Sequence, residues 1–141
     1  MIGRFKFEIL SKYPHLTETE GGIWTRFIQK YPKYFDSVDY DIPVGNFRGN
    51  IEDLKEEWQR NAGYLGKYKI DCVGYKGDVI TIVEVKKEAT TKALGEIWLY
   101  EFLYKKDKMP VERVDCLILT DYEMPNMSEI CQSDNVKIII V

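Results

Sequence analysis

The sequence predicts an α/β protein with a mixed central sheet that is flanked by helices, and two observations carry this prediction. The middle of the chain contains two β-rich runs, YKIDCVGYK and DVITIVEVK, which a turn near residues 76–78 joins into a hairpin. The last third of the chain then follows a helix–strand–helix–strand order, which is typical of parallel strands in one sheet with helices on its faces.

The first third of the chain predicts one helix and one strand. The run FKFEIL is compatible with a short strand or with the start of a helix. Residues 17–31 carry apolar side chains at helical spacing, with Thr17 or Thr19 as the N-cap and Pro32 as the end. Residues 37–47 alternate, as a strand does. The single apolar face of this predicted strand would consist of Val38, Tyr40, Ile42 and Val44.

Residues on either side of the hairpin predict the remaining elements. Residues 51–65 are spaced as a helix that ends near Gly63, and residues 88–106 predict a second, long helix. The run ERVDCLILT predicts a buried strand and the run VKIIIV a last strand, with a short helix over residues 127–132 between them.

Length and composition predict a single domain over residues 1–141. The chain is 45% hydrophobic and 30% charged, which is typical of soluble globular proteins. It has no apolar run near the ~20 residues of a membrane helix, and charges interrupt the apolar residues at its start, unlike a secretory signal. Cys72, Cys116 and Cys131 are widely spaced, which predicts buried thiols in a reducing, cytoplasmic compartment.

Charge and histidine content exclude several classes of protein. The net charge of −3 argues against a general nucleic-acid coat protein. Lysines and arginines gather in the first helix and around the hairpin, which leaves open either a local basic face or ordinary solvated side chains. His15 is the only histidine, so sites that need two histidines are excluded. We expect His15 to be a solvated loop residue.

Polar residues interrupt the apolar pattern of the hairpin at two places. Residues two apart in a strand share a face, so Glu84 and Lys86 point the same way. Asp71 interrupts the preceding strand, and the hairpin can place it beside Glu84. Two such carboxylates repel in a partly buried place unless a cation offsets their charge. Carboxylate oxygens suit Mg²⁺ or Mn²⁺, with the Val85 backbone carbonyl as a further candidate ligand.

Lys86 would complete a hydrolytic site. An ammonium group near the cation can position the attacking water or stabilise negative charge on a phosphoryl oxygen. The three residues therefore predict metal-assisted hydrolysis of phosphodiesters. The alternative is an ordinary ion pair between Glu84 and Lys86 at the end of an edge strand, with Asp71 a solvated acid.

The stretch from residue 68 to about residue 104 resembles the core of the PD-(D/E)XK nucleases, which have the restriction-endonuclease-like fold. Asp71 matches the first acid of that family. Glu84 matches the second acid and Lys86 the lysine, while Ile70 stands where the family has a proline. The resemblance implies a Mg²⁺- or Mn²⁺-dependent cut of DNA, less often of RNA.

The following helix extends the resemblance. RecB-like members carry an A-x-x-Q-x-x-x-Y pattern after the lysine, and the run ALGEIWLY keeps Ala93 and Tyr100 but has Glu96 in place of glutamine. Glu96 could add a metal ligand or pair with Lys86. Its alternative is a surface pair with Lys92, four residues before it.

Family members often add an acid from the first helix, and Glu20 is the candidate metal ligand because it precedes the apolar stripe. The pattern Thr17-x-x-Glu20 is also a capping box, which is the alternative. Three lysines near the motif are candidate phosphate contacts or ordinary surface residues: Lys67, Lys69 and Lys87. The tryptophans predicted to lie in the core are Trp24, Trp58 and Trp98.

The sequence thus predicts a metal-dependent nuclease acting on DNA. Its catalytic residues would be Asp71, Glu84, Lys86 and Glu96, and its metal ligands Asp71, Glu84, Val85 and Glu20. The alternative is a non-catalytic nucleic-acid-binding or assembly module of the same fold. A homodimer is a further expectation, because small nucleases of this kind commonly pair to reach two strands.

Overall fold

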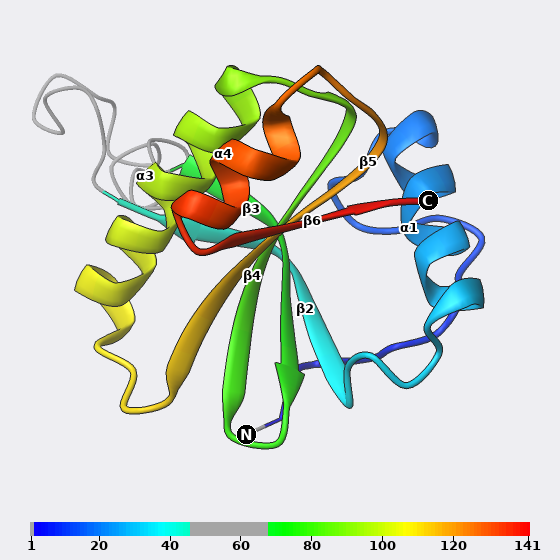
Figure 1. The fold of residues 1–141 in the computed structure, drawn as a ribbon. Helices are drawn as coiled ribbons and strands as arrows, with labels where there is room; N and C mark the ends of the chain where they lie inside the picture. The colour runs from blue at the N-terminus through cyan, green and yellow to red at the C-terminus, as the bar shows by residue number, and fades with distance from the viewer. Residues whose placement is uncertain (1, 46–67) are drawn as a thin grey trace, which may run out of the picture.

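One six-stranded sheet forms the centre of the computed structural model, which describes residues 2–45 and 68–141 (Figure 1). The strands lie in chain order: β1 (Phe5–Lys6), β2 (Ser37–Val44), β3 (Tyr68–Lys76), β4 (Val79–Ala89), β5 (Arg113–Glu123) and β6 (Val136–Ile140). Strands β1 to β4 pair antiparallel, whereas β4, β5 and β6 run parallel. The predicted mixed sheet is therefore confirmed.

Helices cover both faces of this sheet (Figure 1). Helix α1 (Glu18–Lys30) packs its buried residues into one apolar cluster, and helices α3 (Thr91–Lys108) and α4 (Met127–Ser133) pack theirs into the other. This arrangement confirms the predicted fold class. The helix predicted over residues 51–65 lies outside the described residues. In the part of the chain that the structure describes, no helix is long and apolar enough to cross a membrane.

A capping box begins α1. The Thr17 hydroxyl accepts a hydrogen bond from the Glu20 amide at 3.2 Å, and the Thr17 amide donates to the Glu20 carboxylate at 2.9 Å. Both amides would otherwise lack partners at the helix start. Of the two predicted caps, the structure therefore contains Thr17, and the helix ends at Lys30, before Pro32.

The β3–β4 hairpin sets the position of the motif residues. A two-residue turn joins the strands, and Gly77 in this turn adopts a left-handed φ of 56°. The paired register runs from Lys76 opposite Val79 to Cys72 opposite Val83. Asp71 and Glu84 are the next residues of the two strands, so they lie at the same level of the hairpin, at its end away from the turn.

Strand β2 does not keep a single apolar face, so the prediction of one was wrong. Val38 and Tyr40 pack into the cluster on the α1 side of the sheet, whereas Ile42 and Val44 pack into the cluster on the α3 side. Asp41, between them, has a left-handed φ of 55°. Such a residue breaks the two-residue alternation of a strand, and the side chains beyond it change faces.

The tryptophan prediction holds for one residue and fails for another. Trp24 is fully buried, but Trp98 is 49% exposed. The buried side of α3 consists of Ala93, Leu94, Ile97 and Tyr104, and Trp98 lies outside that stripe. Trp58 lies outside the described residues. All three cysteines are buried free thiols, as predicted.

Gly74 on β3 packs so closely against Phe35 that a side chain is excluded. A Cβ at Gly74 would lie 2.4 Å from two carbons of the Phe35 ring, whereas one at Gly95 on α3 would meet nothing within 4 Å. We expect Gly74→Ala to lower the free energy of unfolding by about 1–3 kcal/mol, measured by urea denaturation. The matched control Gly95→Ala should raise it by up to about 1 kcal/mol. Equal stabilities would contradict this packing.

Candidate active site

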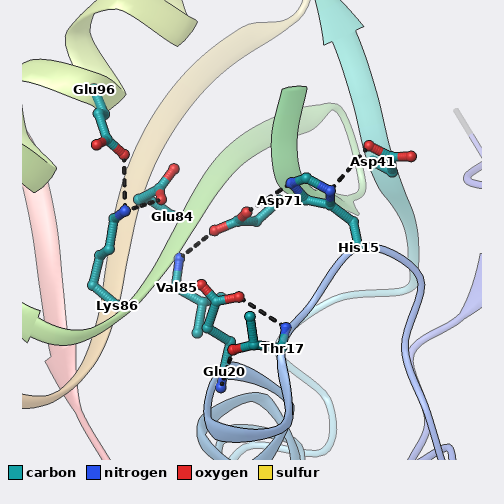
Figure 2. A network of polar contacts seen from close by, with 9 residues as sticks. All are labelled: His15, Thr17, Glu20, Asp41, Asp71, Glu84, Val85, Lys86 and Glu96. Atoms are coloured by element: carbon teal, nitrogen blue, oxygen red, sulfur yellow. Dashed lines mark hydrogen bonds and ion pairs between the residues drawn. The ribbon is translucent and has the colours of Figure 1, made fainter. Parts of the chain in front are cut away.

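Three motif residues lie together where the hairpin meets the helices (Figure 2). Asp71 and Glu84 are buried, with 6% and 3% of their surface exposed, and Lys86 is half-buried beside them. An acid is rarely buried to this degree without a partner. The geometry therefore agrees with convergence of the two acids rather than with the solvated Asp71 of the alternative.

The Asp71 carboxylate is held by the neighbouring strand. Its Oδ2 accepts a hydrogen bond from the Val85 amide at 2.9 Å. This bond connects β3 and β4 beyond Cys72 and Val83, the last pair of the regular register. Burial raises the pKa of Asp71 above its ordinary value, and the bond from the Val85 amide opposes that rise.

Glu84 has an ion pair at one carboxylate oxygen and no hydrogen-bond partner among the described residues at the other. Its Oε1 lies 3.5 Å from the Lys86 ammonium. Its Oε2 is buried and has no hydrogen-bond partner among the described residues. Burial, and next the charge of Asp71, raise the pKa of Glu84 well above its ordinary value. A carboxylate in this state gains stability from any additional positive charge that reaches it.

Lys86 lies between two acids. Its Nζ is 3.1 Å from Glu96 Oε2 on α3, in addition to the contact with Glu84. Burial lowers the pKa of Lys86, but the bond to Glu96 and the charge of Glu84 raise it by more, so the net shift is upward. The side chain therefore keeps its positive charge. Of the alternatives for Glu96, the structure contains the pair with Lys86.

Tyr100 of α3 lies close to the same acids. Burial raises the pKa of its phenol, and the charges of Glu84 and Glu96 raise it further. The hydroxyl therefore stays neutral and remains a hydrogen-bond donor. Ala93, the other retained residue of the helix pattern, is buried in the cluster under α3, and Tyr100 packs against that cluster. Both retained residues therefore face inward.

Glu20 lies near the site but already serves as a helix cap. Its Oε1 accepts from the Thr17 amide, and its charge contributes to the raised pKa of Asp71. The capping-box alternative is confirmed. A role for Glu20 as a metal ligand stays a prediction.

The structure describes two of the three lysines that are candidate phosphate contacts. Lys69 is half-buried on β3 and Lys87 is exposed on β4. Lys67 lies outside the described residues. Phosphate contacts by these lysines, and metal binding by the Val85 carbonyl, stay predictions.

Two residues of the site were missed in the sequence. His15 is exposed, as expected for a loop residue, but its Nε2 lies 3.5 Å from Asp71 Oδ1 and its Nδ1 lies 3.3 Å from Asp41 Oδ1 (Figure 2). Asp41 carried a usable signal, because it interrupts an apolar strand as Asp71 does. His15 carried none, since Asp71 lies 56 positions further along the chain.

The donor set around the acids is sparse. Within residues 2–45 and 68–141, no three side chains of His, Cys, Asp or Glu are grouped so that they could hold a metal ion together. A cation at Asp71 and Glu84 would therefore need backbone carbonyl oxygens and water to complete its shell, which is the usual situation for Mg²⁺.

The fold matches solved structures, one of which is a repair endonuclease. No protein-family model matches the chain, and no curated protein matches it either. A repair endonuclease from Pyrococcus abyssi superposes with a TM-score of 0.52 and 13% identity, covering 93% of this chain and 49% of that chain. An EndoMS–dsDNA2 complex superposes with a TM-score of 0.51 and 11% identity, covering 94% and 48%.

This likeness establishes the fold alone, because the identities are low. The chain spans about half the length of either structure, at 49% and 48%. The fold is thus one that a solved repair endonuclease also has, in agreement with the restriction-endonuclease-like architecture predicted from the sequence.

Glu84→Gln removes the buried charge but keeps the shape of the side chain. Folding raises the pKa of Glu84, so the folded state holds the Glu84 proton more tightly than the unfolded state does. The stability that this protonated carboxyl contributes is present below pH 4.5, the ordinary pKa, and is lost as the pH rises toward the raised pKa. Metal-free wild type should therefore lose stability from about pH 5 upward, and Glu84→Gln should be about 1–3 kcal/mol more stable at alkaline pH. Urea denaturation in a chelator at several pH values measures both. A wild type that gains stability over this range would contradict the assignment.

Proposed function

We propose that this chain is a metal-dependent nuclease of the PD-(D/E)XK class that hydrolyses phosphodiester bonds in DNA. The observation that supports it most is the buried pair of Asp71 and Glu84 with the Lys86 ammonium 3.5 Å from Glu84. The likeness in fold to a solved repair endonuclease and to an EndoMS–dsDNA2 complex supports the same class of chemistry.

The residues present fit a divalent cation such as Mg²⁺ or Mn²⁺. Two buried carboxylates supply hard oxygen donors, and Glu84 Oε2 is a buried acceptor without a partner among the described residues. Asp71, Glu84 and the Val85 carbonyl would hold the ion. When bound, the ion would polarise the scissile phosphate and activate the attacking water.

Lys86 would act as a fixed positive charge. Because its pKa is raised by Glu96 and Glu84 despite burial, it is suited to stabilise negative charge on the phosphate rather than to accept a proton. Glu96 would hold the ammonium in place through the 3.1 Å contact. In this arrangement the acids would bind the cation, and the lysine would face the phosphate.

DNA is the substrate that we propose. The support is the EndoMS–dsDNA2 complex among the structural neighbours, together with Lys69 and Lys87 on the strands that carry the acids. Lysines at such positions can contact backbone phosphates. RNA is a separate substrate for the same assay.

The second candidate function is a nucleic-acid-binding or assembly module without turnover. The observation in its favour is that the described residues contain no group of three metal-binding side chains. A module of this kind would bind DNA, but Mn²⁺ affinity would not differ between wild type and Glu84→Gln in a calorimetric titration.

Cleavage of single-stranded, duplex and branched DNA, and of RNA, in Mg²⁺ or Mn²⁺ tests the nuclease. We expect Asp71→Ala and Lys86→Ala each to lower the rate at least about 100-fold, because each removes charge stabilisation in the transition state. Lys106→Ala, an exposed lysine of α3, is the control and should cleave as wild type does. A chelator should abolish cleavage.

Two results would exclude the proposal. One is the absence of cleavage of every substrate by wild type in either metal, which leaves the binding module. The other is undiminished cleavage by Asp71→Ala and Lys86→Ala, which would mean that these residues do not form the active site.

A further inference from the structure

We infer that Asp41 and His15 form a bridge that positions the Asp71 carboxylate for the cation, so that Asp41 is a positioning residue acting through His15. The inference rests on the proposed metal site. It goes beyond that site because it assigns roles to two residues outside the motif.

The His15 ring lies between two acids (Figure 2). Its Nε2 faces Asp71 Oδ1 at 3.5 Å, and its Nδ1 faces Asp41 Oδ1 at 3.3 Å. The second oxygen of Asp71 is held by the Val85 amide at 2.9 Å. Both oxygens of Asp71 therefore have a neighbour that restricts rotation of the carboxylate.

The sheet itself creates the need for this bridge. Asp41 falls between two register pairs of β2 and β3, Tyr40 with Cys72 and Ile42 with Ile70, and Asp71 is the residue of β3 at the same level. Like charges directly opposite on neighbouring strands are destabilising. The His15 ring lies between the two acids with one nitrogen toward each, so it separates the two carboxylates and restricts the position of Asp71.

Both bridge residues have an uncommon backbone conformation. His15 has φ 71° and Asp41 has φ 55°, in the left-handed region that costs a residue other than glycine about 1–2 kcal/mol. Such conformations persist where the surroundings hold them, and they gather at functional sites. The bridge is therefore a place where the fold accepts strain.

Buried neighbours hold the two strained positions. His15 lies between Tyr13 and Leu16, which are both buried, and the Tyr13 hydroxyl is 2.7 Å from Thr25 Oγ1 on α1. Asp41 follows Tyr40, whose hydroxyl accepts a hydrogen bond from the Trp24 indole at 2.9 Å. The core next to α1 thus fixes both ends of the bridge.

Residues that orient a metal ligand have a measurable effect. Their loss typically lowers metal affinity or activity about 10–100-fold, although they do not touch the ion. The same range is expected here for loss of Asp41 or His15, and the effect should pass through Asp71.

Four variants of the full chain separate orientation from backbone strain. Asp41→Gly accepts the left-handed conformation but removes the carboxylate. Asp41→Asn keeps both the conformational tolerance and an oxygen acceptor. His15→Ala removes the ring, and the fourth variant combines Asp41→Gly with His15→Ala.

Calorimetric titration of the metal-free protein with Mn²⁺ is the measurement. We expect Asp41→Gly and His15→Ala each to weaken Mn²⁺ binding about 10–100-fold, and Asp41→Asn to restore most of the wild-type affinity. The double variant should bind no more weakly than His15→Ala alone, because Asp41 acts through the ring. Asp71→Ala should bind more weakly than any of them.

The histidine spectrum gives a readout that does not depend on the metal. His15 is the only histidine of the chain, so its ring signals in a ¹H–¹⁵N spectrum need no further assignment. Asp41→Gly should shift the Nδ1 signal, and Asp41→Asn should shift it less. Thermal unfolding should show Asp41→Gly folded, with no loss beyond that of the removed contact.

Distinct results would overturn the bridge and the proposed function. Wild-type Mn²⁺ affinity in His15→Ala, or additive losses in the double variant, would overturn the bridge. An unchanged Nδ1 signal in Asp41→Gly would also overturn it. If Asp71→Ala retains wild-type Mn²⁺ affinity, the metal site itself is absent, and the proposed function fails first.

Discussion

The burial of two carboxylates at the same level of neighbouring strands is the constraint on which the rest of the site depends. Asp71 and Glu84 are almost completely removed from water, and burial raises the pKa of both. Two such groups in one place are unfavourable unless positive charge or hydrogen-bond donors surround them. The local structure supplies partners from several elements, and Glu84 Oε2 still lacks a hydrogen-bond partner within the described residues.

These partners come from both faces of the sheet. The Val85 amide on β4 and the His15 ring before α1 lie against Asp71, while the Lys86 ammonium lies between Glu84 and Glu96 of α3. The mixed sheet makes this possible, because its antiparallel half brings the acids together and its parallel half places α3 over the same end. The fold is therefore also the arrangement that concentrates charge at one point.

Asp41 of β2 has a strained backbone conformation and also lies in the candidate site. The left-handed backbone of Asp41 changes the face to which the following side chains point, so the same strand packs against α1 in its first half and against α3 in its second. It also places a third acid near Asp71, across from the only histidine of the chain. A break in strand geometry thus serves both cores and the candidate site.

The sequence by itself determined the order of the elements, the capping box of α1 and the facing of Glu84 and Lys86, because these follow from local periodicity and from short-range hydrogen bonds. Only the tertiary structure decided the pairing of Glu96 with Lys86 and the arrival of His15 beside Asp71. The exposure of Trp98 and the change of face at Asp41 were likewise not predictable from the sequence. Each of these depends on which surfaces meet across the sheet, and residue spacing along one element does not contain that information.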